Sequence, residues 1–266
     1  MKEKITPKIG LALGSGGARG LSHIGVIKIL KENNIPIDFI AGSSIGALVG
    51  GFYASGMSIE DIEKVALDAN WKQIFSLVDL SFNKSGLVEG EKVKKFIKDH
   101  LGKVQFEDCL IPFKAVATDL KNGNAVVFDS GEMGSAIRAS ISVPLFFKPV
   151  KIGSKLLYDG GLSKPVPVDI AREMGADIVI AVNINGSYSD KTKEGDHSLY
   201  TITQNSIRIM NKNLAAANIQ DADIVVTPIV GDTKWNEFVN GKKLILAGEE
   251  AANRVLLEIK KKIESF

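Results

Sequence analysis

The sequence predicts an α/β fold whose sheet is parallel or mostly parallel and is covered by helices on both faces. Segments with the apolar runs of buried strands alternate along the chain with segments that have helical spacing. The strand segments are apolar at nearly every position, which is typical of strands buried on both faces. No proline-rich or serine-rich linker divides the 266 residues. We therefore expect a single domain over residues 7–266.

Each predicted element depends on a local pattern. Short apolar runs indicate strands, and apolar residues spaced three and four apart indicate helices. Ser58 followed by Asp61 marks the start of one helix, and Lys121-Asn122-Gly123 predicts a turn between two strands. In chain order we expect strand 9–13, helix 21–33, strand 39–41, helix 47–54, helix 59–69, helix 93–100, strand 113–118, strand 124–128, helix 133–139, strand 155–157, helix 166–173, strand 177–182, helix 199–218, strand 222–226 and helix 243–263.

Composition excludes several classes of protein. The net charge is +2 and no long basic stripe is present, so we expect no nucleic-acid partner. The single cysteine, Cys109, excludes an intrachain disulfide framework and a cysteine-rich metal site. The N-terminus has no apolar signal region, and no apolar run reaches the roughly 18 residues of a membrane span. We expect a cytoplasmic protein.

A candidate nucleophile lies between the second strand and the helix after it. Gly42-Ser43-Ser44-Ile45-Gly46 matches the Gly-x-Ser-x-Gly pattern in the strand–turn–helix context that a nucleophile elbow requires. The two glycines allow strand and helix to pack closely around a strained turn that presents Ser44. The alternative is an ordinary turn in which Ser44 caps the helix.

A glycine-rich loop follows the first strand, from Gly14 to Gly20 (GSGGARG). Because it opens a helix, its N–H groups lie at the positive end of the helix dipole, where they suit a phosphate or the oxyanion of acyl transfer. The nucleotide patterns fit poorly, since a Walker loop needs a lysine and a dinucleotide fingerprint needs glycine where Arg19 stands. The oxyanion role fits better, because the serine turn belongs to the next strand–helix unit.

A candidate base lies in Tyr158-Asp159-Gly160-Gly161, after the strand at 155–157. Two glycines behind the aspartate allow its carboxylate to approach another backbone closely. The alternative is a plain turn, which Asp-Gly favours.

The histidines argue against a Ser-His-Asp triad. His197 alone follows Asp159, and it lies in a polar loop; His100 ends a helix, and His23 lies one turn into the helix behind the glycine loop. A Ser44–Asp159 dyad is the economical alternative. An ordinary aspartate, with a pKa of about 3.9, is a weak base at neutral pH. Burial must therefore raise the pKa of Asp159, or the site must rely on its oxyanion loop.

These three motifs, in this order, resemble the patatin-like phospholipase family. The segment at 11–20 is similar to the family's opening strand and loop, and 117–120 is similar to a segment of bacterial members. Residues 136–140 with Val143-Pro144 are similar to the helix before the aspartate strand. The match covers roughly residues 9–185, and the tail beyond about 190 is less diagnostic.

The resemblance implies a three-layer α/β/α sandwich with a mostly parallel sheet, which hydrolyses ester-linked acyl chains of lipids through a Ser–Asp dyad. It assigns Ser44 as nucleophile and Asp159 as base, and no metal or cofactor. Arg19 would support the loop or meet a lipid phosphate. Many members have a third glycine where this chain has Ser15. The oxyanion hole would be formed by Gly16, Gly17 and Ala18, and the supporting glycines are Gly14, Gly20, Gly42, Gly46, Gly160 and Gly161.

The expected partners are a lipid or acyl-ester substrate and a membrane surface touched peripherally; the oligomeric state stays open. One alternative is a general carboxylesterase or thioesterase, and another is a regulatory protein on the same scaffold without turnover. An apolar stretch within residues 71–82 is a candidate acyl-binding lip, and the alternative is that its side chains pack in the core. It comprises Trp71, Ile74, Phe75, Leu77, Val78, Leu80 and Phe82.

Overall fold

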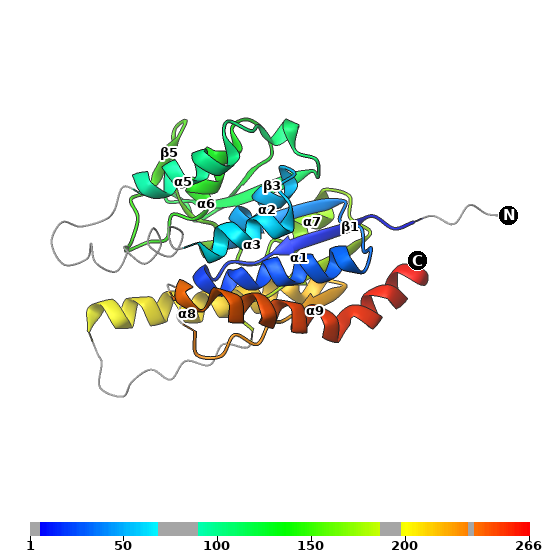
Figure 1. Cartoon of the computed structure of the whole chain (residues 1–266). Helices are drawn as coiled ribbons and strands as arrows, with labels where there is room; N and C mark the ends of the chain where they lie inside the picture. The colour runs from blue at the N-terminus through cyan, green and yellow to red at the C-terminus, as the bar shows by residue number, and fades with distance from the viewer. Residues whose placement is uncertain (1–5, 69–89, 187–197, 234–236) are drawn as a thin grey trace.

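The computed structural model describes residues 6–68, 90–186, 198–233 and 237–266. Within them an eight-stranded sheet has the strand order β5-β6-β3-β2-β1-β7-β8, with β4 paired to β3 (Figure 1). The strands are β1 (Ile9–Leu13), β2 (Phe39–Ser43), β3 (Phe113–Asp119), β4 (Ala125–Phe128), β5 (Val150–Ile152), β6 (Lys155–Asp159), β7 (Ile178–Val182) and β8 (Ile224–Val226).

The helices follow the strands in the alternation that the sequence predicts. The α-helices are α1 (Ser22–Glu32), α2 (Ile45–Ala54), α3 (Ile59–Leu67), α5 (Glu91–Leu101), α6 (Met133–Ser140), α7 (Val168–Glu173), α8 (Leu199–Asn218) and α9 (Gly241–Glu264). Short 3-10 helices are η1 (Gly17–Leu21), η3 (Phe106–Asp108), η4 (Gly160–Leu162), η5 (Ile219–Asp221) and η6 (Phe238–Asn240).

The sheet is mixed, with a parallel part at its centre. Neighbouring strands run parallel from β3 through β2, β1 and β7 to β8. The remaining strands, β4, β5 and β6, pair antiparallel at one side of the sheet. The α/β class is therefore confirmed. Strand β5 was not predicted, because three residues give too short a pattern.

Several boundaries differ from the expected ones for local reasons. The helix after the glycine loop is entered through η1, so its helical turns begin at Gly17. Helix α7 starts at Val168 and not at residue 166, because Pro167 occupies its N-cap position. Helix α3 ends at Leu67, where Asp68 turns extended. As expected, Ser58 caps α3 by accepting from the N–H of Asp61 at 3.1 Å.

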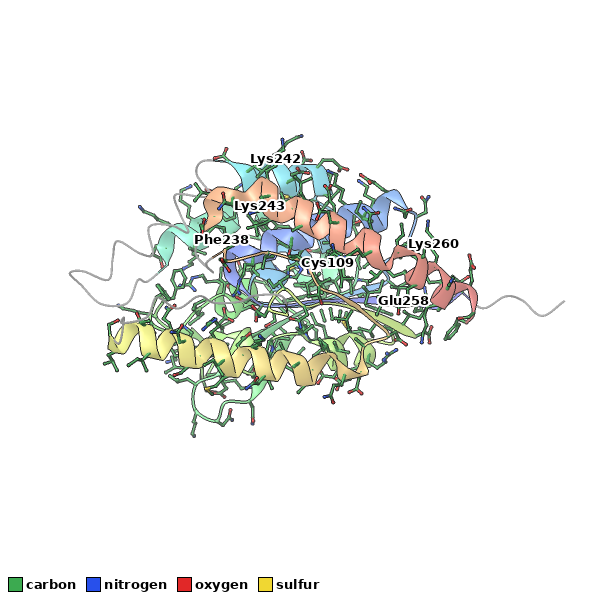
Figure 2. The ribbon with its side chains drawn as sticks, turned by 90° about the horizontal axis from the view of Figure 1, so that it is seen from below. Cys109, Phe238, Lys242, Lys243, Glu258 and Lys260 are labelled. Carbon is green, nitrogen blue, oxygen red and sulfur yellow. The ribbon has the colours of Figure 1, made fainter. Side chains whose placement is uncertain are left out.

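The strand side chains divide the molecule into three layers. Ile9, Leu11 and Leu13 of β1 point into the core shared with α1, α2 and α9. On the opposite face Ala12 belongs to a second core with α7 and Ala215 of α8. Figure 2 shows α9 (orange to red) and α8 (yellow) on opposite sides of the sheet. The parallel strands thus end at one sheet edge with helices above and below.

Helix α9 packs along α1 with its backbone in close contact. A Cβ on Gly25 of α1 would collide with the carbonyl of Ile245, and a Cβ on Gly248 would collide with the carbonyl of Ser22. The two helices approach closely because each presents a glycine to the other. This contact joins the last helix to the helix that follows the glycine loop.

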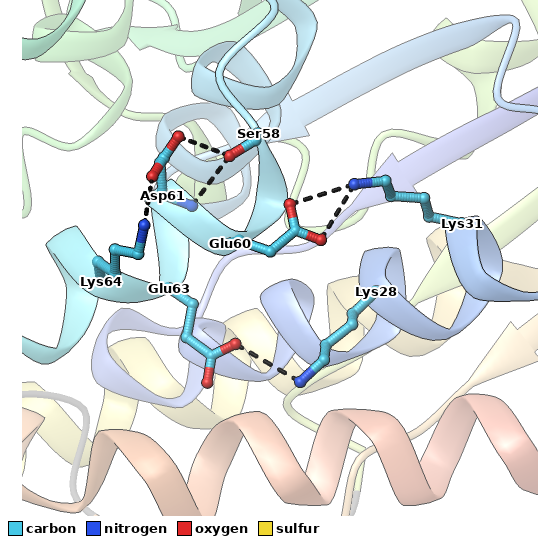
Figure 3. A network of polar contacts seen from close by, with 7 residues as sticks. All are labelled: Lys28, Lys31, Ser58, Glu60, Asp61, Glu63 and Lys64. Atoms are coloured by element: carbon cyan, nitrogen blue, oxygen red, sulfur yellow. Dashed lines mark hydrogen bonds and ion pairs between the residues drawn. The ribbon is translucent and has the colours of Figure 1, made fainter.

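Ion pairs at the surface link α1 to α3 and to α9. Lys28 of α1 lies 3.6 Å from Glu63 of α3, and Lys31 lies 3.0 Å from Glu60 (Figure 3). Lys28 also donates to Glu249 of α9 at 2.9 Å. Surface pairs of this kind each contribute about 0–1 kcal/mol, so they add little to the stability of the helix packing.

We predict that Gly248→Ala lowers the free energy of unfolding of the whole chain by about 2 kcal/mol or more, because the added methyl group forces α9 away from α1. If residues 7–266 form one domain, denaturant unfolding followed by circular dichroism gives a single transition at a lower midpoint. The matched control is Gly134→Ala in α6, whose Cβ would meet only the Ile97 side chain, at 3.3 Å. An unchanged midpoint, or two separate transitions, contradicts the prediction.

Candidate active site

Ser44 lies at the sharp turn between β2 and α2. Its backbone has φ 55° and ψ −123°, a conformation that is costly for a residue with a side chain. The turn is held from behind, since the N–H of Ser44 donates to Oγ of Ser140 at 2.9 Å. A Cβ on Gly46 would collide with the carbonyl of Leu13 in β1. The close packing of strand and helix therefore requires glycine there, as the elbow pattern predicts.

The Ser44 side chain does not cap the helix. It occupies the N-cap position of α2 but makes no capping hydrogen bond. Its Oγ instead donates to Oδ2 of Asp159 at 2.6 Å, across 115 residues of sequence. The structure therefore brings together the two residues that the sequence paired, and the ordinary helix-cap alternative is not observed.

Asp159 ends β6 and is fixed at four points. Its Oδ1 accepts from the N–H of Gly161 at 2.8 Å, while Oδ2 receives the Ser44 hydroxyl. Its N–H donates to the carbonyl of Ser142 at 3.0 Å, and its carbonyl accepts from Oγ1 of Thr118 at 2.7 Å. Because β6 pairs with β3, which in turn pairs with β2, Asp159 reaches Ser44 across one intervening strand.

Burial changes the proton affinity of the carboxyl. Ser44 is 5% exposed and Asp159 is 6% exposed. Desolvation raises the pKa of Asp159 from 3.8 to about 6, although the hydrogen bonds from Ser44 and Gly161 favour the ionised form and partly oppose it. This is the direction of shift that a carboxylate base needs, because a pKa nearer to neutrality strengthens the base.

Backbone hydrogen bonds hold the glycine loop against two segments, the end of β7 and the connection between η4 and α7. The N–H of Gly14 donates to the carbonyl of Val182 at 3.1 Å, and that of Ser15 to the carbonyl of Pro165 at 2.8 Å. Gly17 has φ 61°, which favours glycine. The N–H groups of Gly17 and Ala18 open η1, where the first N–H groups of a helix have no intrahelical acceptor. They are therefore available to an anion.

Arg19 is folded into the loop. It is buried, and its Nε donates to the carbonyl of Gly16 at 3.1 Å. Of the two roles the resemblance implies, this contact is the one expected of loop support. Gly20 lies against Ile45, where a Cβ would collide with that side chain. The loop and the serine turn are consequently packed against each other.

The histidines lie away from the reacting pair. Nε2 of His23 donates to the carbonyl of Gly14 at 2.7 Å, and complete burial lowers its pKa to about 4. It is therefore neutral at physiological pH and supports the loop. Nδ1 of His100 donates to the carbonyl of Phe96 at 2.9 Å within α5. His197 and the apolar stretch from Trp71 to Phe82 lie outside the described residues.

Three polar residues at the site were not predicted. Ser140, besides holding the N–H of Ser44, donates to the carbonyl of Val116 at 2.5 Å. Nδ2 of Asn185 donates to the carbonyl of Ser15 at 2.8 Å and to Oδ1 of Asn211 at 2.9 Å. Asn211 of α8 in turn donates to the carbonyl of Gly161 at 2.8 Å. The available signal was polar residues directly after the buried strand β7, which place Asn185 at the same sheet edge.

No group of three or more metal-binding side chains is found among the described residues. Cys109, labelled in Figure 2, has its sulfur 3.7 Å from the sulfur of Met133. Burial raises the pKa of its thiol to about 11, so it stays protonated at neutral pH. None of the described helices is long and apolar enough to cross a bilayer.

Comparison with known proteins identifies relatives over the same residues. The family model for patatin-like phospholipase matches residues 11–172. An uncharacterised NTE family protein of Mycobacterium tuberculosis (strain ATCC 25618 / H37Rv) is 41% identical over 191 residues, which cover 72% of this chain and 53% of the relative. Lysophospholipase NTE1 of Debaryomyces hansenii is 34% identical over 190 residues, 69% of this chain and 12% of the relative. The chain thus spans about half the length of the mycobacterial relative, and much less of the fungal one.

A solved structure shares the fold. The crystal structure of VipD from Legionella pneumophila superposes with a TM-score of 0.57 at 13% sequence identity, covering 95% of this chain and 67% of that chain. The likeness confirms the α/β/α arrangement with its mixed sheet.

We predict that Asp159→Asn stabilises the fold at neutral pH. The folded chain keeps the Asp159 proton up to a pH of about 6, whereas an unfolded aspartate releases it near 4. The folded state of the natural chain therefore loses stability as the pH rises through this window, and the asparagine variant does not. The difference of about two pKa units corresponds to at most about 3 kcal/mol above pH 6.

The measurement is the free energy of unfolding of both proteins at several pH values. The advantage of the variant should be small near pH 4 and should grow until about pH 6. A stability difference that is independent of pH would show that burial does not raise the pKa of Asp159 in the folded chain.

Proposed function

This chain belongs to the patatin-like phospholipase family, and from that premise we propose that it is a serine acyl hydrolase that cleaves fatty-acyl esters of phospholipids or lysophospholipids. The observation that carries the proposal is the 2.6 Å hydrogen bond from Ser44 Oγ to Asp159 Oδ2 at a strained turn. Relatives named lysophospholipase support an ester of a lipid as substrate.

In the proposed first step, Ser44 Oγ attacks the ester carbonyl carbon while its proton passes to Oδ2 of Asp159. The hydrogen bond already points the hydroxyl proton at the acceptor, so little reorganisation precedes the transfer. The pKa of about 6 makes Asp159 ionised at neutral pH, yet more basic than an exposed aspartate. The same carboxyl then returns the proton to the leaving alcohol.

The oxyanion of the tetrahedral intermediate is assigned to the N–H groups of the glycine loop at Gly16, Gly17 and Ala18. Gly17 and Ala18 lie at the start of η1, which runs on into α1, so their free N–H groups and the helix dipole act together. Backbone donors of this kind are fixed by the fold, which is why they stabilise developing charge effectively.

The second step of the proposed reaction is hydrolysis of the acyl-enzyme. Asp159 is ionised again after the alcohol departs, and it takes a proton from a water that attacks the acyl carbon. Ser44 regains its proton as the fatty acid leaves. Metal chemistry has no part in either step of this scheme.

We predict that a fluorophosphonate probe forms one covalent adduct with the natural chain and none with Ser44→Ala. Only an activated serine reacts with such probes, so the adduct separates an enzyme from a non-catalytic protein on the same scaffold. Hydrolysis of a phospholipid or lysophospholipid by Ser44→Ala should fall by at least about a thousandfold. Intact-mass analysis and fatty-acid release are the measurements, with circular dichroism as the control for folding. An adduct that persists in the variant would remove Ser44 as nucleophile.

We also predict that kcat/KM for a soluble short-chain ester rises with pH and levels off with an apparent pKa of about 6. The reaction needs Asp159 without its proton, so the rate is lost as the pH falls below this value. His23 does not account for such a step, since its pKa is about 4. A rate that stays constant between about pH 5 and pH 8 would contradict the role of Asp159 as base.

A further inference from the structure

We propose that the exposed face of α8 docks the chain on an anionic lipid surface beside the dyad. The proposal rests on the function proposed above and names the surface through which that site would meet its substrate. It concerns one helix of the described chain and none of the residues assigned to the reaction.

Four large apolar side chains lie on the solvent side of α8. Leu199, Ile202, Ile209 and Met210 are between 50% and 82% exposed. With Ser206 and Asn213 they form a stripe at the spacing of one helix face. The opposite side of the helix carries buried Ala215 and the part-buried Asn211. Helix α8 is therefore amphipathic in an unusual sense, because its solvent side is the apolar one.

Among the described residues, the exposed apolar side chains of α9 do not form such a face. On α9, Leu246 and Leu257 are exposed, but the helix also carries Glu249, Glu250 and Glu258. Single exposed leucines among charges are ordinary on a protein surface. A contiguous apolar face on a long helix is not, and it indicates a binding surface.

The charge of α8 suits an anionic partner. Its 20 residues include Arg208 and Lys212 but no aspartate or glutamate. Lys212 is exposed and lies three positions after Ile209, beside that edge of the stripe. Apolar residues together with nearby basic residues and no acidic ones are the features of helices that lie in the interface of a membrane.

The position of α8 places the helix next to the site, with Asn211 on the side that contacts the site and the apolar stripe on the solvent side. Asn211 donates to the carbonyl of Gly161, two residues from Asp159, and to Oγ of Ser15 at 3.3 Å. Residues 199–210 thus extend from the site by roughly 18 Å of helix. Figures 1 and 2 show α8 along one margin of the molecule, with one end projecting from it.

The burial of the dyad makes the location of α8 important for the access of a lipid to the site. Ser44 and Asp159 are nearly inaccessible, so a lipid must leave its aggregate close to the site. Leu162, which follows Gly161 directly, is itself 38% exposed. One exposed apolar side chain therefore lies at the aspartate turn, which α8 contacts through Asn211.

A second copy of the chain is the rival occupant. Leu199, Ile202, Ser206, Ile209 and Asn213 follow the spacing of a coiled coil. The pattern covers only about two heptads, two of its five seam positions are polar, and no pairs of opposite charge flank it. These features favour the lipid surface.

The test compares two matched double variants. Ile202→Glu with Ile209→Glu places two acidic groups on α8, and Leu246→Glu with Leu257→Glu places the same two groups on α9. Each is assayed for cosedimentation with vesicles of an equimolar mixture of phosphatidylcholine and phosphatidylglycerol. Release of fatty acid from these vesicles and hydrolysis of a soluble short-chain ester are measured in parallel, with Met210→Glu as a milder α8 variant.

We expect the α8 double variant to bind the vesicles at least about tenfold more weakly. Each glutamate replaces an apolar side chain that docking would bury in the membrane interface, and it repels anionic lipid. Vesicle hydrolysis should fall with binding, while soluble-ester hydrolysis stays within about twofold of the natural chain. The α9 double variant should match the natural chain in all three assays.

Several outcomes would overturn the proposal. One is a natural chain that does not bind the vesicles; another is equal vesicle binding by the α8 variants. A natural chain that is dimeric in size-exclusion chromatography, with a monomeric α8 variant that still binds vesicles, would assign the face to a second copy. If the natural chain binds vesicles through α8 but hydrolyses neither substrate, the docking surface stands and the proposed function fails.

Discussion

The fold of this chain depends on how one strained turn is held. Ser44 has a backbone conformation that costs energy, and it is held by hydrogen bonds from both its N–H and its hydroxyl. The partners of these two bonds, Ser140 and Asp159, stand on either side of the same strand, because Ser140 bonds to Val116 of β3 and Asp159 ends the strand paired with β3. Strand β3 thus supports the nucleophile and the carboxyl at once, and it is the strand at which the parallel part of the sheet meets the antiparallel part.

The same burial that holds the pair also sets its chemistry. Asp159 donates its backbone N–H to Ser142 and accepts from Gly161 through its carboxylate, so its position does not depend on solvent. Withdrawing the carboxylate from water costs stability, and its hydrogen bonds offset only part of this cost. The glycine loop completes the site from the other side, where neutral His23 and buried Arg19 both support its carbonyl groups. Stability and reactivity are therefore opposed at one residue.

Local motifs made much of this predictable from the sequence. The elbow, the glycine loop and the aspartate turn each occupy a few adjacent residues whose types are dictated by backbone geometry. Ser140, Asn185 and Asn211 were not predicted, because their partners lie 96, 170 and 196 residues away. Only Asn185 has a local signal, its place directly after the buried strand β7. The pairing of β6 with β3 could not be derived either, because the residue pattern of a strand does not say which strand it pairs with. The exposed apolar face of α8 was not predicted, because apolar residues at helical spacing usually pack in the core.

The crossing of α1 and α9 has a consequence for how the catalytic region is delimited. Gly248 of α9 contacts the backbone of Ser22, and the next residue, His23, holds the carbonyl of Gly14. The match to the family model ends at residue 172, well before α9 begins at Gly241. An expression fragment cut at the limit of similarity would keep every motif but would leave the helix behind the glycine loop without its neighbour. The smallest useful fragment is therefore defined by helix packing, and alignments alone would place its end too early.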